Sequence, residues 1–269
     1  MTILITGVTG LVGERLVPRL IEAGVKCRVL LRPGKQPPKD AEVVTGDILN
    51  AASLAEAVQG VSAVIHLAAV FRTQDLDLIW KSNLDGTRNL IAALKAHAPE
   101  ARLIMASTSH VYSVDNPHPG REDDVVDPQH AYPASKAAAE REVRASGLTF
   151  AILRFPFVYG DGDGHLEALP EHIGTWHPAQ RMSTIHHQDI AAAMQMALHG
   201  AMDGRVVNIA DDAPLSVYEL VEVIGVTLPS SSVPLPNPWH LTMDVSLARS
   251  LGFKPIVRTV YEAKRNGLM

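Results

Sequence analysis

Strand and helix meet at Gly7-Val8-Thr9-Gly10-Leu11-Val12-Gly13, which follows the apolar run Ile3-Leu4-Ile5 and opens an amphipathic segment over residues 11–23. Glycines between a strand and a helix allow a tight turn, let a ligand approach the backbone, and let the helix pack closely on the strand. The first turn of such a helix offers amide groups and the positive end of its dipole to an anion. The stretch therefore predicts a loop that binds the pyrophosphate of a dinucleotide, with a turn that binds no ligand as the weaker interpretation.

Strand and helix patterns alternate through the first part of the chain. Short apolar runs typical of strands are interleaved with longer helical patterns, as β-α-β crossovers require. The expected strands are 26–31, 42–45, 63–67, 102–105 and 150–153, and the expected helices are 54–58, 78–97 and 132–146. We therefore expect an α/β protein in which residues 1–155 form a Rossmann-type, doubly wound parallel sheet with helices on both faces.

The pattern changes from residue 156 onward. Proline and glycine are dense at 159–164 and 228–238, which is typical of loops. Helical periodicity persists at 188–199, 217–223 and 246–251. We expect residues 156–269 to form a smaller C-terminal α/β lobe that binds substrate, parts of which can return to the Rossmann sheet. This lobe should close over the carboxyl ends of the strands, where ligands of open α/β sheets bind.

Composition limits the classes of partner. The net charge is −5, and no cluster of basic residues alternates with aromatic ones, so we expect no nucleic acid partner. Met1 leads straight into the first strand pattern, and no apolar run approaches the length that spans a bilayer, so we expect a cytoplasmic protein without a membrane partner. Cys27 is the single cysteine, which excludes an intrachain disulfide, and we interpret it as a small buried apolar residue.

A cation occupies the position that would meet the adenosine ribose. NAD enzymes usually carry an acidic residue after the second strand, where it accepts a hydrogen bond from the ribose 2′-hydroxyl, but here Arg32 stands at that point. A guanidinium cannot accept this bond and can pair with a 2′-phosphate. We therefore expect NADP in preference to NAD. The alternative is a solvated loop arginine beside Lys35 and Lys39.

A tyrosine and a lysine stand four residues apart at the start of a predicted helix. In Tyr132-Pro133-Ala134-Ser135-Lys136 this spacing places the phenol and the ammonium on one face. A free tyrosine has a pKa near ~10, and a nearby cation would favour its anion, so Lys136 can tune Tyr132 for acid–base chemistry. Upstream, Ser107-Thr108-Ser109-His110-Val111-Tyr112 follows the strand at 102–105 and offers hydroxyls to hold a substrate carbonyl.

In this combination and order the motifs resemble the extended short-chain dehydrogenase/reductase (NAD-dependent epimerase/dehydratase-like) family. That family includes nucleotide-sugar epimerases, dehydratases and carbonyl reductases, and the resemblance covers nearly the whole chain. It implies that Tyr132, Lys136 and a Ser/Thr are catalytic. By register with Val111-Tyr112, that Ser/Thr is Thr108 and not its serine neighbours. Asn83, in Asn83-Leu84-Asp85-Gly86-Thr87, matches the family's helix asparagine, so the resemblance implies that Asn83 is catalytic as well.

The resemblance also implies the contacts to the cofactor. Gly46-Asp47-Ile48 resembles the segment whose acid contacts adenine, and His66-Leu67-Ala68-Ala69 resembles the loop that lines the cofactor. Arg154-Phe155-Pro156-Phe157-Val158-Tyr159-Gly160 matches a signature of the sixth strand. The expected cofactor-binding residues are Gly7, Thr9, Gly10, Leu11, Val12, Gly13, Arg32, Asp47, Ile48, Leu67, Ala68, Ala69, Ser107, Tyr132, Lys136, Phe155, Phe157 and Val158.

Departures from the family pattern favour one reaction. Family dehydratases carry an Asp-Glu pair directly after the catalytic threonine, where this chain has Ser109-His110. Nucleotide-sugar epimerases typically have an asparagine three residues after the strand-six arginine, and here that residue is Phe157. We therefore expect reduction of a carbonyl or oxidation of a secondary alcohol. A nucleotide-sugar epimerase is the alternative, favoured by Arg181 and Asp189, and a redox-sensing NADP-binding regulator is a third hypothesis.

The substrate residues are the least defined by sequence. We expect a small-molecule carbonyl, alcohol or sugar to meet Ser109, His110, Tyr159, Arg181 and His186, and we leave a homodimer open. His186-His187 lies near Asp189, but adjacent residues on a strand point to opposite faces and no ligand spacing accompanies them. We therefore expect no metal site.

Overall fold

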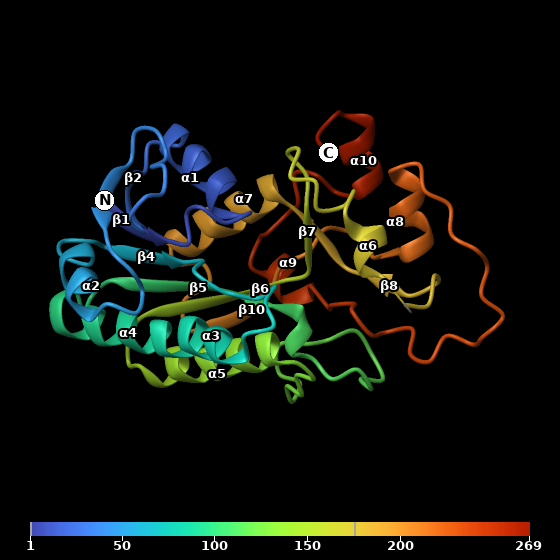
Figure 1. Cartoon of the computed structure of the whole chain (residues 1–269), viewed down its shortest axis with the longest axis horizontal. Coiled ribbons are helices and arrows are strands. Elements are labelled where there is room, and N and C mark those ends of the chain that lie inside the picture. The colour runs from blue at the N-terminus through green and yellow to red at the C-terminus, as the bar shows by residue number, and fades with distance from the viewer. Residues whose placement is uncertain (1, 175) are drawn as a thin grey trace.

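A seven-stranded parallel sheet forms the centre of the molecule (Figure 1). The computed structural model describes residues 2–174 and 176–269. The sheet has the order β10-β6-β5-β4-β1-β2-β3, so the chain winds outward in both directions from the neighbouring strands β1 and β4. The loops that follow these two strands therefore meet at the carboxyl edge of the sheet. The strands are β1 (Thr2–Thr6), β2 (Lys26–Leu31), β3 (Glu42–Thr45), β4 (Ala63–His66), β5 (Arg102–Thr108), β6 (Phe150–Phe155) and β10 (Arg205–Asn208).

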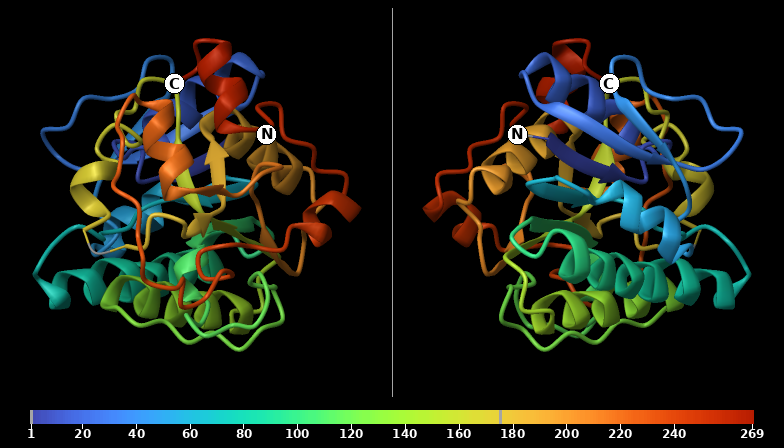
Figure 2. Two further views of the ribbon diagram at one scale, coloured as in Figure 1. Left: turned by 90° about the vertical axis from the view of Figure 1, so that its right-hand side faces the viewer. Right: turned by 90° about the vertical axis from the view of Figure 1, so that its left-hand side faces the viewer.

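Helices cover both faces of this sheet, as the two side views show (Figure 2). One face carries α1 (Gly13–Glu22), α7 (His187–Leu198) and α9 (Ser246–Ser250). The opposite face carries α2 (Ala51–Ala57), α4 (Gly86–His97) and α5 (Ala131–Ala145), with the short α3 (Leu76–Trp80) against α5. The expected doubly wound Rossmann sheet is confirmed.

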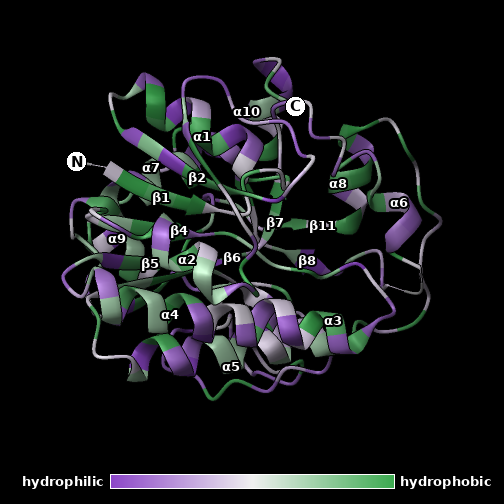
Figure 3. Cartoon of the chain, turned by 60° about the vertical axis from the view of Figure 1, so that its left-hand side comes forward, coloured by the Kyte–Doolittle hydropathy of each residue, from purple (hydrophilic) through white to green (hydrophobic). Residues whose placement is uncertain are grey.

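The strands are apolar on both sides because both sides are buried. Side chains alternate along a strand, so Ile3 and Ile5 of β1 pack into the core under α1 and α7, while Leu4 between them packs into the core over α2 and α4. All three are fully buried. In Figure 3 the central strands are accordingly coloured mostly as hydrophobic, and the covering helices carry hydrophilic residues as well.

The second lobe lies beyond the carboxyl edge of the sheet, at the right of Figure 1. It contains two small sheets, β7 (Phe157–Tyr159) with β9 (Thr184–His186) and β8 (Arg181–Met182) with β11 (Leu215–Ser216), and the helices α6 (Leu169–His172), α8 (Val217–Val223) and α10 (Val260–Arg265). These elements share an apolar core of their own. β10 and α7 come from the same half of the sequence but belong to the main sheet and its cover. The functional division at residue 155 remains a prediction.

Two local differences from the sequence expectation concern the site. The expected helix over residues 78–97 is interrupted by a π-helical turn, Lys81–Asp85, between α3 and α4. π-turns are rare and are frequently found at functional sites. Strand β5 continues past residue 105 to Thr108, where a short 3₁₀ turn, Ser109–Val111, begins. In the part of the chain that the structure describes, no helix has both the length and the apolar character needed to span a membrane.

Candidate active site

The glycine loop after β1 is tightly packed against its surroundings. Gly7 has a positive φ of 74°, and a side chain there would meet the backbone of Leu67 and Ala68, the latter at 2.5 Å. A side chain on Gly13 would lie 2.4 Å from the carbonyl oxygen of Gly7. These two glycines therefore let the loop lie close to the segment after β4 and to the start of α1.

The third glycine leaves space at the start of α1. A side chain on Gly10 would meet only the Gly7 carbonyl oxygen, at 3.3 Å. Among the described residues, the amides of Leu11 and Val12 donate to no protein atom, as expected of groups at a helix start. Free amides, the helix dipole and an open approach suit a pyrophosphate. The loop thus fits a dinucleotide, with Thr9 exposed at its tip.

Three residues are expected to bind the adenosine half of the cofactor: Arg32 is open to solvent, and Asp47 and Ile48 are held by contacts within the protein. Arg32 follows β2 and is exposed. Asp47 accepts a hydrogen bond from the Leu49 amide at 2.9 Å, which holds the carboxylate in a turn. Ile48 lies against Gly86, where any side chain would come within 2.9 Å of it. The last contact explains why the first residue of α4 is a glycine.

His66, at the end of β4, connects the cofactor loops through a chain of buried hydrogen bonds. Its Nδ1 lies 2.7 Å from Thr6 Oγ1, and its Nε2 lies 3.0 Å from Thr87 Oγ1. The Thr87 hydroxyl donates to the carbonyl oxygen of Asn83, so its oxygen accepts from Nε2–H, and Nδ1 accepts from Thr6. Burial, and next the charge of Lys136, lower the pKa of His66 to about 3. The ring is therefore neutral and structural.

Asn83 lies in the π-turn and joins the loop after β4 to α5. Its Oδ1 accepts from the Val70 amide at 2.7 Å, and its Nδ2 donates to the Val70 carbonyl at 2.8 Å and to Ser135 Oγ at 2.9 Å. Both amide hydrogens are thus used. These contacts hold the segment of residues 67–70 beside the helix that carries Tyr132. Leu67 and Ala68 are half-buried in that segment, and Ala69 is exposed. The expected catalytic role of Asn83 remains a prediction.

Thr108 ends β5 with a hydroxyl whose hydrogen has no acceptor in the described protein. Its Oγ1 accepts a hydrogen bond from the His110 amide at 3.2 Å. The hydroxyl hydrogen can therefore be donated to a substrate oxygen. Ser107 faces elsewhere, because its Oγ donates to Glu140 Oε1 at 2.5 Å. Its expected contact with the cofactor remains a prediction.

A buried ion pair beneath Thr108 supports α5. Arg154 of β6 donates to both carboxylate oxygens of Glu140, at 3.0 and 2.6 Å, and to the Tyr112 hydroxyl at 2.9 Å. Tyr112 in turn donates to Asn208 of β10 at 2.6 Å. Such a pair is stable only when its hydrogen bonds are satisfied, as they are here. The network therefore fixes the strand ends relative to the helix that carries Tyr132 and Lys136.

Tyr132 and Lys136 lie in the first turns of α5, which packs on β5 and on the 3₁₀ turn after it. Burial raises the pKa of Tyr132 to about 12. Burial also lowers the pKa of Lys136 to about 8, although Glu140 opposes this shift. The spacing of Tyr132 and Lys136 predicts a lowered tyrosine pKa, but the structure gives the opposite direction, because burial penalises the phenolate. The phenol is thus protonated at neutral pH.

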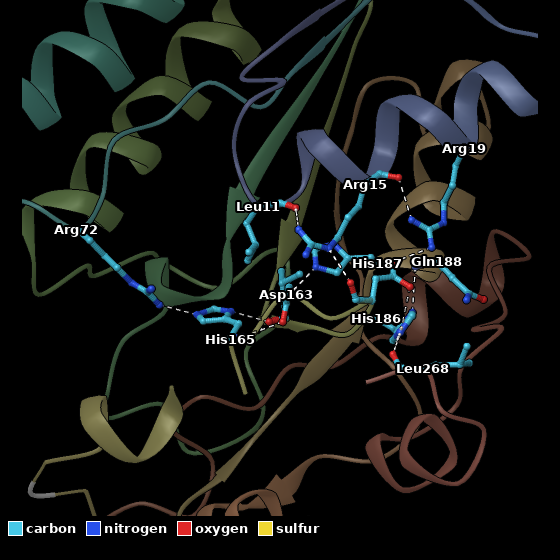
Figure 4. Close-up of polar contacts among 12 residues, drawn as sticks. Leu11, Arg15, Arg19, Arg72, Asp163, His165, His186, His187, Gln188 and Leu268 are labelled. Atoms are coloured by element: carbon cyan, nitrogen blue, oxygen red, sulfur yellow. Dashed lines mark hydrogen bonds and ion pairs between the residues drawn. The ribbon is translucent and has the colours of Figure 1, made fainter. Parts of the chain in front are cut away.

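Two aromatic residues and an arginine, absent from the sequence-based set, complete the site. The Phe71 ring lies 5.5 Å from the Tyr132 ring. Arg72, on the loop after β4, donates to His165, on the loop after β7, at 2.5 Å (Figure 4). His165 stacks on Phe157, with ring centres 4.4 Å apart. The signal for Phe71 and Arg72 was their position directly after the cofactor loop. No local pattern indicated His165.

The remaining expected residues lie on the strands β6, β7, β8 and β9. Phe155 and Val158 are buried, and the Val158 carbonyl accepts from His165 Nδ1 at 2.7 Å. Tyr159 is fully buried in the second core, and Arg181 is exposed on β8. His186 uses both ring nitrogens on backbone groups of Gln188 and Leu268. These contacts give no support to a substrate role for Tyr159, Arg181 or His186, which remains a prediction.

A second cluster of polar residues lies beside the glycine loop. His187 Nε2 lies 2.8 Å from Asp163 Oδ2, and Arg15 donates both to the Leu11 carbonyl at 3.1 Å and to the Asp161 carbonyl at 3.4 Å (Figure 4). Burial alone would raise the pKa of Asp163, but hydrogen bonds from His187 and the His165 amide lower it overall. The cluster ties the loop after β7 to the glycine loop. Over residues 2–174 and 176–269 no group of three metal-ligating side chains converges on a metal site.

The model of the NAD dependent epimerase/dehydratase family matches residues 3–210. The chain belongs to this family. A member of the NAD dependent epimerase/dehydratase family is an enzyme that works with a nicotinamide dinucleotide, and relatives of the chain carry names of reductases and dehydrogenases.

Three proteins illustrate the range within the family. The ceramide reductase of Caulobacter vibrioides is 32% identical over 202 residues, which are 71% of this chain and 58% of that protein. The 4-hydroxy-2-methyl-3-oxo-4-farnesyl-3,4-dihydroquinoline-1-oxide ketoreductase of Stigmatella aurantiaca is 26% identical, over 87% of this chain and 76% of that protein. The structure of MoeE5 in complex with UDP-glucuronic acid and NAD is 27% identical, with a TM-score of 0.79 over 97% of this chain and 95% of that chain.

Proposed function

We propose that this enzyme catalyses hydride transfer between a nicotinamide dinucleotide and a carbonyl or secondary alcohol. Tyr132 gives the proton to the carbonyl oxygen and Thr108 holds that oxygen. The observation that carries the proposal is this pair of hydroxyls: the Thr108 hydrogen is free to donate, and the Tyr132 phenol stays protonated because burial raises its pKa to about 12. When bound, the dinucleotide supplies or accepts the hydride.

Lys136 supports this chemistry as a buried cation. It is 2% exposed and lies on the same face of α5 as Tyr132, one turn away. Its pKa of about 8 leaves most molecules charged at neutral pH, where the ammonium favours any negative charge that develops on the phenol oxygen. Lys136 also lies near the end of β4, because its charge contributes to the lowered pKa of His66. That position suits a contact with the nicotinamide ribose.

The second lobe favours net reduction over epimerisation of a nucleotide sugar. Phe157 presents a ring stacked on His165, and an apolar ring offers no hydrogen bond to a diphosphate or sugar. Two relatives named as reductases agree with this proposal. A nucleotide-sugar epimerase remains the alternative function, because the structure of the relative MoeE5 is a complex with UDP-glucuronic acid and NAD.

Arg32 favours NADP as the cofactor. Its side chain is exposed beside the end of β2, and among the described residues it takes part in no ion pair, so the guanidinium is available to a 2′-phosphate. The glycine loop itself accepts the pyrophosphate of either cofactor. We therefore propose that the protein binds NADP more tightly than NAD, while NAD can still bind.

The test is a cofactor assay with purified protein. Oxidation of NADPH should depend on an added ketone or aldehyde, whereas an epimerase would interconvert sugars without net oxidation and a regulator would show no turnover. A parallel thermal shift with UDP-glucose should be small, because a ligand raises stability only when it binds the folded state. A large shift with UDP-glucose, together with no NADPH oxidation by any carbonyl, would favour the epimerase.

A further inference from the structure

A pocket of about 200 Å³ is lined by residues that directly follow Thr108 and Tyr132 in the chain. His110 lines it and gives its amide to Thr108, while Pro133 lines it and follows Tyr132 in the chain. Trp176 and Trp239 of the second lobe line it as well. The pocket therefore brings the residues next to Thr108 and Tyr132 together with two tryptophans that the proposed chemistry does not use.

The segment that carries Trp239 is irregular but is held at several points. Asn237 donates to the carbonyl oxygens of Val114 and Asn116, at 2.7 and 2.9 Å, and accepts from the Trp239 amide at 2.9 Å. Gln180 donates to the His240 carbonyl at 2.5 Å. A loop held in this way places its side chains reproducibly, which a binding site requires.

The tryptophans remain partly exposed in this arrangement. Trp176 is 38% exposed and Trp239 is 44% exposed. Trp80, the third tryptophan of the sequence, is also 38% exposed but lies on α3, away from the pocket lining. An exposed ring alone means little, and the distinction is that two of the three tryptophans line the same pocket as the residues that follow Thr108.

The pocket carries no fixed charge. Its described lining includes no lysine, arginine, aspartate or glutamate. The side chain of His110 is exposed, and desolvation by the surrounding atoms, followed by the charges of the nearby His240 and His130, lowers its pKa. Burial lowers the pKa of His240 as well, although Asp115 opposes the shift. Neutral imidazoles can hydrogen-bond a substrate, but they do not neutralise a diphosphate or a carboxylate.

Size limits the ligand further. An apolar cavity of ~150 Å³ accommodates one benzene molecule. A pocket of about 200 Å³ thus has the size for one six-membered ring with a short substituent.

We propose that this pocket binds the body of the substrate, and that the substrate is an uncharged carbonyl compound with a single six-membered ring attached to the carbonyl. The ring lies against Trp176 and Trp239, and the carbonyl oxygen points to Thr108 and Tyr132. This inference rests on the proposed carbonyl reduction, but the pocket can also be tested by binding alone.

The experiment compares acetophenone, acetylbenzoate and an open-chain methyl ketone of equal carbon number as substrates with NADPH. Acetophenone should have the highest kcat/KM, about tenfold or more above acetylbenzoate, since an unpaired carboxylate would be desolvated. Trp239→Ala should raise the KM for acetophenone about tenfold, the effect of losing most of the contact with an aromatic ring. Trp239→Phe should largely restore it, and Trp80→Ala should change neither constant. Trp176→Ala provides an independent variant if Trp239→Ala does not fold.

Saturable quenching of tryptophan fluorescence by acetophenone reports binding without turnover. Quenching that is lost in Trp239→Ala but retained in Trp80→Ala supports the pocket even if no carbonyl is reduced, in which case the proposed function fails and the binding site stands. Turnover with equal use of acetylbenzoate, or with an unchanged KM in both Trp239→Ala and Trp176→Ala, overturns the pocket and leaves the reductase intact.

Discussion

Arg72, on the loop after β4, donates from Nη2 to Nε2 of His165, 2.5 Å away on the loop after β7. The contact requires a neutral His165 whose Nδ1 carries the hydrogen, and Nδ1 lies at hydrogen-bond distance from the Val158 carbonyl, 2.7 Å away. Phe71, the residue before Arg72, touches Tyr132. One hydrogen bond therefore connects the second lobe to the segment beside Tyr132.

The first prediction concerns this connection. Arg72→Ala removes a charge-assisted hydrogen bond, of which ~1.5 kcal/mol is a reasonable value at an exposed position. The loop after β4 should then open more often, and NADPH should dissociate roughly tenfold faster in a stopped-flow experiment. Arg258→Ala is the control, since Arg258 pairs with Asp212 and is 69% exposed. Equal dissociation rates in the parent and Arg72→Ala would show that the contact does not restrain the cofactor.

The second prediction separates the roles of the three proposed catalytic residues. Tyr132→Phe should abolish turnover and leave NADPH affinity nearly unchanged, because only the transferable proton is lost. Thr108→Ala should lower kcat by about 10²–10³, the usual loss of one donor to a developing oxyanion. Lys136→Ala should weaken both turnover and NADPH affinity. Turnover and affinity are measured side by side, and substantial activity in Tyr132→Phe would mean that the proton comes from another group.

The third prediction concerns the choice of cofactor. Arg32→Asp should lower the preference for NADP over NAD by one to two orders of magnitude, the order expected for loss of a charge-assisted pair with a phosphate. Dissociation constants for both cofactors, in the parent and the variant, provide the measurement. A parent protein that binds the two cofactors equally well would contradict the assignment of Arg32.

The fold was predictable wherever one local pattern required it. The glycine spacing at residues 7–13 demanded a close approach of backbone, and Gly7 and Gly13 do face backbone atoms that exclude a side chain. The π-turn at Lys81–Asp85 was not predictable, because a continuous helical pattern looks the same with one extra residue in a turn. The return of β10 to the main sheet depends on long-range pairing with β6, which periodicity does not encode.

The sequence predicts the candidate hydroxyls of the site but not the residues that support them. Tyr132 and Lys136 stand at a recognisable spacing, the family resemblance points to Thr108, and their catalytic roles remain predictions. The Glu140–Arg154 pair was missed, because a buried ion pair joins residues whose separate sequence contexts look ordinary. The raised pKa of Tyr132 was missed for a related reason: its burial depends on Phe71 and other distant segments, whereas the lysine that would lower it is local.

The last prediction concerns the pH dependence of carbonyl reduction. The pKa of Tyr132, about 12, keeps the phenol protonated through the working range, so the ammonium of Lys136, with a pKa of about 8, should determine the alkaline limb. At saturating NADPH, kcat/KM should fall above about pH 8 as one proton is lost.

Loss of this proton from Lys136 does not destabilise the fold, so unfolding driven by Lys136 does not account for the decline. The pKa of Lys136 in the unfolded chain is the ordinary 10.5. Between these values the unfolded chain binds more protons, so this group makes folding more favourable as pH rises. Denaturant unfolding and activity are therefore measured over the same pH series. Lys136→Arg, whose guanidinium stays charged, should move the limb to higher pH. A flat profile through pH 8–10 in the parent would show that the charge on Lys136 does not assist the reaction.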